Sequence, residues 1–207
     1  MVLTVQSDQL SDLFLIIADF YKYPDQEFYD QLISSKLLSE LKEKMQKLEL
    51  ETSSINQDFD IPDFDQFKQE YSRCFIGLNE PSALPVESVY KVWTTDSQAQ
   101  VNIANEKGYL MGDSALHIKH LMSGLGLEIP REYQQMPDHL TILLELLAYI
   151  IEHRQADEIK QFLDDHFDWL MDFKSRLVEI EALPLFLRIT ECLMDCIEQT
   201  KTIYKKL

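Results

Sequence analysis

Apolar residues recur at intervals of three and four along almost the whole of this chain, and this spacing strongly constrains the fold. Such intervals place side chains on one face of an α-helix, whereas a half-buried β-strand needs strict alternation of apolar and polar residues. The first run comprises Leu10, Leu13, Phe14, Ile17, Phe20 and Tyr21. Glycine, with 5 residues among 207, offers few sites for tight β-turns. The pattern therefore predicts an all-α protein.

Residues that start and stop helices divide the first quarter of the chain. Ser7 or Asp8 can cap a first helix. Pro24 ends that helix, because the residue before a proline is pushed out of the α region. Asp25 is expected to cap a second helix, and residues 37–48 carry the pattern of a third. These signals predict a series of separate helices.

A long irregular segment, residues 78–105, interrupts the helical pattern. The helix before it starts at Asp63 and ends at Gly77, because glycine adopts the left-handed backbone that often closes a helix. The helix after it covers residues 112–125, and its inward stripe is expected to be Leu116, His120, Leu121 and Leu125. The apolar side chains of residues 78–93 either plug the protein's own core or line an exposed groove.

The rest of the chain predicts three more helices. An apolar helix follows Pro137, one continuous helix holds the apolar positions from Ile159 to Leu177, and Pro184 begins the last. A chain of 207 residues is long enough for one well-buried core and short for two ordinary domains. A single core is therefore expected.

We expect this core to belong to one all-α domain of two packed halves joined by a hinge-like connector. The N-terminal half covers about residues 1–126, and the C-terminal half covers residues 138–207. The connector, residues 127–137, is the stretch between the helix that stops near Gly126 and the helix that follows Pro137.

Acidic residues dominate the charge of the chain. It holds 36 Asp and Glu against 19 Lys and Arg, which gives a formal net charge of −17. Such a charge repels phosphate backbones and anionic lipid headgroups, so it argues against nucleic-acid and membrane-surface partners. It attracts cationic partners instead.

The N-terminal and cysteine patterns predict where the protein works. Residues 1–8 hold no basic region of the kind that opens an export signal, and no window reaches the roughly 18 consecutive apolar residues that span a bilayer. Cys74, Cys192 and Cys196 lack the spacing of a disulfide framework, which indicates free thiols in a reducing compartment. We expect a cytoplasmic protein without stable membrane insertion.

Two pairs of side chains have a helical spacing that would suit metal ligands. His117 and His120 lie three positions apart, and Cys192 and Cys196 lie four apart. Neither pair is accompanied by the further ligands that complete a metal site. We therefore favour a core histidine beside a surface one, and two small buried thiols.

Catalytic machinery has no strong signal in this sequence. It contains no glycine-rich phosphate loop, no dinucleotide fingerprint and no acid–base pair that stands out among the many carboxylates. We therefore expect neither an enzyme nor a cofactor. The alternative is a metal-dependent hydrolase built from His117, His120, Asp138 and His139.

Three short motifs occur in a characteristic order. The first, Glu-Tyr-x-x-x-Phe-x-Gly, is formed by Glu70, Tyr71, Phe75 and Gly77. The second, Pro-x-x-Ser-Val-Tyr, is formed by Pro85, Ser88, Val89 and Tyr90. The third is the pair Asp138 and His139. On an acidic helical chain of this size, these motifs resemble those of the TorD/DmsD/NarJ-type chaperones, which mature molybdenum-containing redox enzymes.

The resemblance implies a chaperone that binds the N-terminal segment of a molybdopterin-containing oxidoreductase. That segment is often a twin-arginine export signal, held until the cofactor is inserted. The resemblance further implies that the peptide-binding residues are Tyr71, Phe75, Leu84, Pro85, Val86, Ser88, Tyr90, Trp93, Asp138 and His139.

The sequence allows two alternatives for each of three features. Asp138 and His139 either contact the client at the join of the two halves, or serve as a helix cap whose neighbour holds the connecting loop. The client is either an exported enzyme or, for a plain helical assembly factor, one without an export signal. The protein acts either as a monomer or as a homodimer.

Overall fold

The computed structural model describes residues 2–55, 59–77 and 81–205. In these residues the regular structure is helical, and the only β pairing is one antiparallel bridge between Val86 and His139. The α-helices are α1 (Val2–Asp19), α2 (Gln26–Ile33), α3 (Lys36–Lys47), α4 (Phe64–Phe75), α5 (Glu87–Tyr90), α6 (Asp113–Leu125), α7 (Leu140–His153), α8 (Ala156–His166), α9 (Leu170–Glu179) and α10 (Pro184–Lys205). Two 3₁₀ turns, η1 (Ser53–Ile55) and η2 (Arg131–Tyr133), lie in the connections. The all-α prediction is confirmed.

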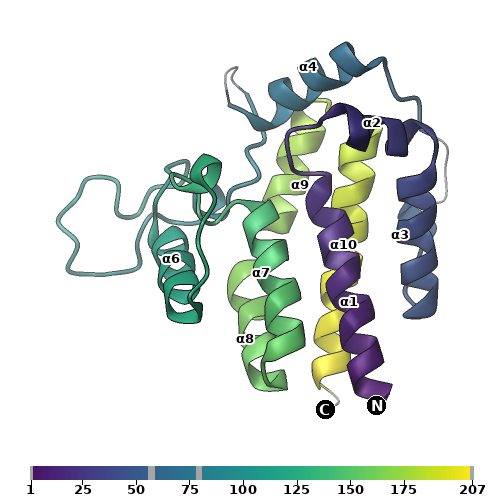
Figure 1. The fold of residues 1–207 in the computed structure, drawn as a ribbon. Coiled ribbons are helices and arrows are strands. Elements are labelled where there is room, and N and C mark those ends of the chain that lie inside the picture. Colours follow the sequence, from purple (N-terminus) through teal and green to yellow (C-terminus); the bar gives the residue numbers. More distant parts are fainter. Residues whose placement is uncertain (1, 56–58, 78–80, 206–207) are drawn as a thin grey trace.

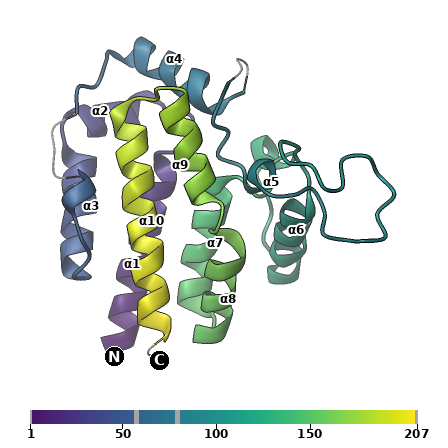
Figure 2. The same ribbon diagram turned by 180° about the vertical axis from the view of Figure 1, so that it is seen from behind.

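The helices form a bundle with an extension on one side. α1 packs along α7, while α10 packs against α8 and α9 (Figure 1). α3 flanks the bundle beside α1, and α4 crosses one end of it. α5, α6 and the loop between them form the extension on the side away from α3, which the opposite view also shows (Figure 2). The candidate site lies where this extension meets the bundle.

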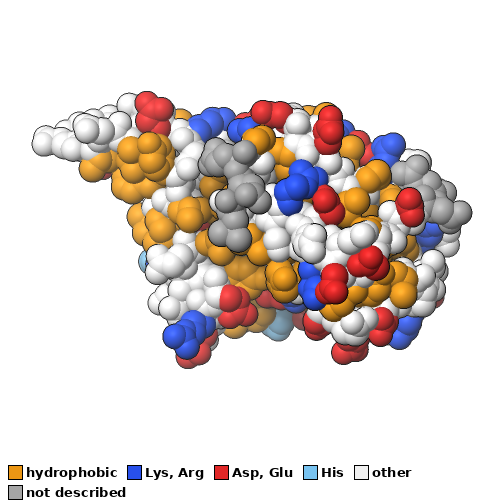
Figure 3. Space-filling view, turned by 90° about the horizontal axis from the view of Figure 1, so that it is seen from above, with side chains coloured by type: hydrophobic (Ala, Val, Ile, Leu, Met, Phe, Trp, Pro, Cys, Tyr) orange, Lys and Arg blue, Asp and Glu red, His pale blue; other side chains and the backbone are white. Residues whose placement is uncertain are grey.

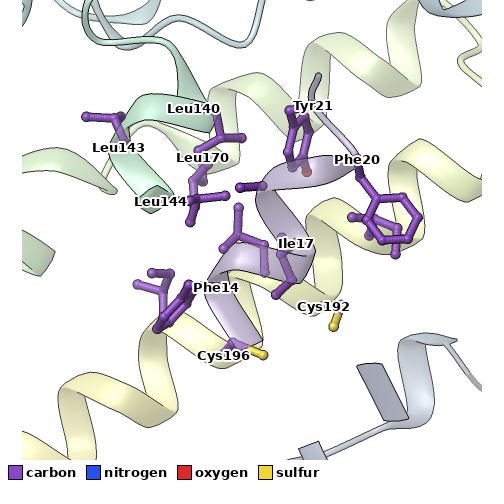
Figure 4. Close-up of a cluster of buried hydrophobic side chains, with 14 of the residues drawn as sticks. Phe14, Ile17, Phe20, Tyr21, Leu140, Leu143, Leu144, Leu170, Cys192 and Cys196 are labelled. Carbon is purple, nitrogen blue, oxygen red and sulfur yellow. The ribbon is translucent and has the colours of Figure 1, made fainter. Parts of the chain in front are cut away.

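The core is shared by helices from the two ends of the chain. α1 and the turn after it contribute Phe14, Ile17 and Tyr21, which meet side chains of α7, α9 and α10 (Figure 4). The Tyr21 hydroxyl also lies 2.9 Å from the Thr190 hydroxyl of α10. Helices on both sides of residues 127–137 thus complete one another's core, and the division into two hinged halves stays a prediction.

Predictions that rest on local capping chemistry are confirmed. Asp25 caps α2 by accepting a hydrogen bond from the Phe28 amide at 2.8 Å. Asp63 caps α4 in the same way through the Gln66 amide at 3.0 Å. Gly77 follows α4 with φ of +72°, the left-handed conformation that was expected there. Pro184 begins α10.

Two predicted helix boundaries are wrong. The first helix begins at Val2 rather than at Ser7 or Asp8, so these two residues lie inside α1. The predicted continuous helix from Ile159 to Leu177 is two helices, α8 and α9, separated by residues 167–169. Apolar positions on both sides of this break face the same core, and no glycine or proline marks it.

The predicted inward stripe of α6 is wrong at Leu116 and His120, which are exposed, and right at Leu121 and Leu125, which pack against the core. The fully or largely buried side chains of this helix are Ala115, Ile118 and Met122, whereas Leu116 is 54 % exposed. The helix packs on the rest of the molecule along only part of its circumference, so helical spacing alone did not fix which apolar residues face inward. Leu121 and Leu125 are half-buried.

Several large apolar side chains are exposed on the extension. Seen from above, hydrophobic side chains cover part of the extension, whereas the outer end of its loop is mostly neither hydrophobic nor charged (Figure 3). The large hydrophobic residues exposed in this part of the chain are Val92, Val101, Tyr109, Leu110 and Leu116. Among the described residues, no helix has the length and apolar character needed to cross a bilayer.

Candidate functional site

Two of the sequence motifs, about 50 residues apart, pair with each other. Val86 forms the single antiparallel bridge with His139, and the Leu140 amide donates to the Pro85 carbonyl at 2.7 Å. The Glu87 amide donates to the Asp138 carbonyl at 3.1 Å. We call this pairing of residues 85–88 with residues 138–140 the motif junction. It fastens α5 to the start of α7.

Asp138 is the buried polar centre of the motif junction. Its carboxylate is fully buried, and Oδ2 accepts a hydrogen bond of 2.7 Å from the Ser88 amide. Asp138 therefore caps the first turn of α5, rather than the helix that directly follows it in sequence. Burial raises the pKa of this carboxyl, while hydrogen bonds from Ser88 lower it in part.

His139 holds the capping position at the start of α7. Its ring Nδ1 accepts a hydrogen bond of 3.2 Å from the Thr141 amide, and the ring packs against Tyr133 at 4.8 Å between centroids. Burial lowers the pKa of His139 to about 3, so the ring is neutral near pH 7. The alternative in which Asp138 caps the helix that follows it is therefore wrong in its detail: His139 caps α7, and Asp138 accepts a hydrogen bond from the first turn of α5.

Tyr71 and Phe75 lie on the inward face of α4. The Tyr71 hydroxyl donates to the Tyr21 carbonyl at 2.7 Å, and the Phe75 ring meets the Phe186 ring at 4.8 Å between centroids. Both side chains are 4 % exposed. In this arrangement they support the core, and direct contact with a client stays a prediction that requires α4 to move.

The remaining predicted residues differ in their access to solvent. Pro85, Val86 and Ser88 are buried in the motif junction. Leu84 and Tyr90 line a pocket of about 670 Å³ between the extension and α9. Tyr90 also stacks on Trp169, with 5.2 Å between ring centroids and 17° between the rings.

Trp93 lies on the loop of the extension. Its indole nitrogen donates to the Leu110 carbonyl at 3.1 Å, and its side chain is half-buried. This hydrogen bond ties the beginning of the loop to its end. Leu84 and Tyr90 thus line one pocket, and Trp93 adjoins it through Leu110, which also lines that pocket.

A chain of hydrogen bonds that the sequence did not predict runs beside the motif junction. Glu87 is fully buried, and its Oε2 lies 2.8 Å from His166 Nδ1. The other ring nitrogen of His166 lies 3.0 Å from His117 Nδ1. Burial, and next the nearby charge of His166, lower the pKa of His117. The chain connects α5, the end of α8 and α6.

Lys91 links the buried Glu87 to the exposed Asp168. Its ammonium lies 2.8 Å from Glu87 Oε1 and 2.7 Å from Asp168 Oδ1. Glu87 stands inside the second motif, directly before Ser88, and this position was the only sequence signal for its role. His166 and Lys91 are too far away in sequence for spacing to link them to each other.

The side chains of the hydrolase alternative are engaged elsewhere. His117 contacts His166, whereas Asp138 and His139 bind backbone amides of the motif junction and α7. Across the described part of the chain, no three His, Cys, Asp or Glu side chains form a group that could hold a metal ion. The geometry therefore gives this alternative no support.

The three cysteines are buried and reduced. Cys192 and Cys196 lie in the core on α10, and Cys74 lies on the inward face of α4. Burial raises the pKa of the Cys74 thiol to about 11, although Arg73 acts in the opposite direction. A thiol of this kind is a packing residue rather than a reactive one.

A comparison with known protein families shows to which family this chain belongs. Residues 35–178 match the family model described as the nitrate reductase delta subunit. The chain belongs to this family. The TorD/DmsD/NarJ-type resemblance seen in the motifs is thereby confirmed.

Curated relatives agree with this assignment. The chaperone protein TorD of Vibrio cholerae is 26% identical over 147 residues, which cover 64% of this chain and 59% of the relative. The Tat proofreading chaperone DmsD of Salmonella typhi is 28% identical over 119 residues, covering 57% of this chain and 52% of the relative. TorD of Shewanella pealeana is 23% identical over 168 residues, covering 81% and 71%. These relatives are named as chaperones and not as enzymes, in agreement with the prediction.

The match is partial in length. The chain spans 59% of the length of the Vibrio TorD relative and 52% of the Salmonella DmsD relative.

The motif junction makes a direct prediction about Asp138. Asp138→Ala leaves the buried Ser88 amide without its acceptor, so we expect the free energy of unfolding to fall by about 1–3 kcal/mol. Asp138→Asn keeps an acceptor oxygen and removes a charge that burial disfavours, so it should cost less. Urea unfolding of both variants measures the difference. Equal stability of Asp138→Ala and the wild type would contradict the capping role.

Proposed function

We propose that this protein is a cytoplasmic chaperone for the catalytic subunit of a molybdenum-containing redox enzyme. It binds the N-terminal segment of that subunit, often a twin-arginine export signal, and holds it while the cofactor is inserted and the enzyme is assembled. Family membership over residues 35–178 supports this role, as do the chaperone names of the TorD and DmsD relatives.

The observation that carries this proposal is the surface next to the motif junction. Leu84 and Tyr90 provide an apolar wall in a pocket whose carboxylates, Asp172 and Glu179, are paired with Lys107 and Arg176 of the same wall. This wall complements the apolar stretch of a twin-arginine signal, and the net charge of −17 attracts the cationic region of the same signal. The exposed apolar side chains of the adjoining loop extend the contact surface.

The ten predicted residues take two kinds of role in this proposal. Leu84, Tyr90 and Trp93 contact the client directly, because they retain access to solvent or to a pocket. The buried residues act by holding that surface in place; they are Tyr71, Phe75, Pro85, Val86, Ser88, Asp138 and His139. In this proposal the protein consists of two halves, and the connector over residues 127–137 lets the surface adjust to its client.

The proposal predicts which force holds the client. A synthetic peptide with two arginines followed by a leucine-rich stretch should bind at about 0.15 M salt, where screening limits diffuse attraction to about 8 Å. Each buried leucine stabilises the complex by about 1.5–3 kcal/mol, and salt does not remove this contribution. Replacing the leucines by serines should therefore abolish binding. Fluorescence anisotropy of the labelled peptide measures the effect.

The control separates specific binding from attraction to an acidic protein. With a net charge of −17, the chain attracts any basic peptide at low salt. If salt abolishes binding while the serine substitutions have no effect, the peptide-binding proposal is wrong. If the peptide does not bind and the protein still supports enzyme assembly, the client is one without an export signal.

A further inference from the structure

A pocket of about 320 Å³ separates α6 from α7 and α8. Leu121 and Leu125 of α6, Ile150 of α7 and Phe162 of α8 provide its apolar wall, and we call it the apolar pocket. Gly124 also lines it, and a Cβ atom added there would meet no heavy atom within 4 Å. The pocket is therefore open at the point where α6 carries no side chain.

A second pocket, of about 730 Å³, borders the apolar pocket. His117 and Asp165 line both of them, so the two spaces are neighbours along α6 and α8. Five carboxylate side chains line the second pocket against two lysines, and we call it the acidic pocket. An excess of carboxylates in a recessed site attracts a cationic side chain.

The protein's own Lys91 shows that this site can hold a cation. Its ammonium lies within 2.8 Å of Glu87 Oε1 and 2.7 Å of Asp168 Oδ1 in the wall of the acidic pocket. In contrast, the Asp165 carboxylate forms no hydrogen bond or ion pair with any residue that the structure describes. Asp165 is thus available to a cation that comes from outside.

Tyr90 provides an independent sign of a missing polar partner. Its side chain is 8 % exposed, and within the described residues its buried hydroxyl has no hydrogen-bond partner. The residue lines both the acidic pocket and the pocket of Leu84, and its hydroxyl lies near the charges of Arg176 and Asp172. An unpaired buried hydroxyl is uncommon and is normally satisfied by a ligand or by water.

We propose that the acidic and apolar pockets bind one peptide in a fixed direction. An arginine side chain enters the acidic pocket beside Asp165 and Tyr90, and the apolar side chains that follow it fill the apolar pocket beside Gly124. This inference rests on the proposed function, because it assigns a place and a direction to the client's N-terminal segment. It also adds a surface on α6 and α8 that the sequence motifs do not include.

The apolar pocket is tested by filling it. Gly124→Leu adds a Cβ atom that meets no heavy atom within 4 Å, and leucine favours the helix more than glycine does, so the variant should fold. It should weaken binding of the arginine–leucine peptide by about tenfold or more, as expected when one buried apolar side chain is displaced. Ser123→Leu is the matched control, because Ser123 is exposed on the same helix outside the pocket. Its affinity should equal that of the wild type.

The acidic pocket is tested by a pair of charge variants. Asp165→Asn should weaken binding of the arginine peptide by about tenfold, and should leave binding of a peptide with glutamines in place of the arginines unchanged. Asp164→Asn changes the net charge equally on the neighbouring position of α8, where the side chain is paired with Lys201 outside both pockets. It should have little effect on either peptide.

The outcomes distinguish failure of the inference alone from failure of the proposed function. If the wild type binds the peptide while Gly124→Leu behaves like Ser123→Leu, the placement is overturned and the proposed function stands. If Asp165→Asn weakens both peptides equally, the assigned direction is overturned. If the wild type does not bind the arginine–leucine peptide at all, the peptide-binding function and the inference fail together.

Discussion

Phe75→Ala is expected to lower the free energy of unfolding by about 3–5 kcal/mol, the usual range for removal of a buried aromatic ring. Phe75 packs between Tyr71 at 5.0 Å and Phe186 at 4.8 Å, measured between ring centroids. Its removal leaves a cavity where α4 meets α10. Chemical denaturation followed by circular dichroism measures the loss.

Two comparisons show whether Phe75 serves the core or the client. Ile76→Ala, at the next position, removes a side chain that is 42 % exposed and should change stability by no more than about 0.5 kcal/mol. Phe75→Leu keeps most of the apolar volume and should retain both folding and peptide affinity. A folded Phe75→Leu variant that no longer binds the peptide would place Phe75 in direct contact with the client.

His139 is expected to make the protein sensitive to acid. Its folded-state pKa, about 3, lies below the ordinary value of about 6.5, because protonation places a charge in a buried site and removes the acceptor of the Thr141 amide. The unfolded state therefore binds this proton more readily. The stabilising contribution is present above about pH 6.5 and is lost at about 1.4 kcal/mol per pH unit as the pH falls toward 3.

His139→Asn tests this prediction, because asparagine can accept the same capping hydrogen bond and does not titrate. We expect the variant to gain stability relative to the wild type as the pH falls from 7 to 5, by about 2 kcal/mol. Asp138, whose raised pKa acts in the opposite direction, is present in both proteins and cancels in the comparison. Urea unfolding at several pH values provides the measurement. If the free energy of unfolding changes with pH in the same way in both proteins, the pKa of His139 in the folded protein is not lowered.

Features decided by neighbouring residues were predictable from the sequence. The caps formed by Asp25 and Asp63, the left-handed Gly77 and the start of α10 at Pro184 all depend on residues within one or two helical turns. Their chemistry is local, so a single sequence is enough to read it. The all-α fold follows from the same local periodicity, repeated along the chain.

Boundaries without a local signal were not predictable. The break between α8 and α9 contains no glycine or proline. The Trp169 indole donates a hydrogen bond across the break to the His166 carbonyl at 2.8 Å. The inward face of α6 likewise depends on which part of the helix meets the bundle. In both cases the apolar pattern permits more than one arrangement, and packing selects one of them.

The site shows the same division between local and long-range causes. The motifs drew attention to residues 85–90 and the Asp138–His139 pair, because their order along the chain is a property of the sequence. Only the tertiary structure decided that these segments bind each other and that Asp138 caps α5. It also brought Glu87 within 2.8 Å of His166, a partner 79 positions away. Such contacts form because folding buries polar groups together, and each then needs a partner that sequence spacing does not specify.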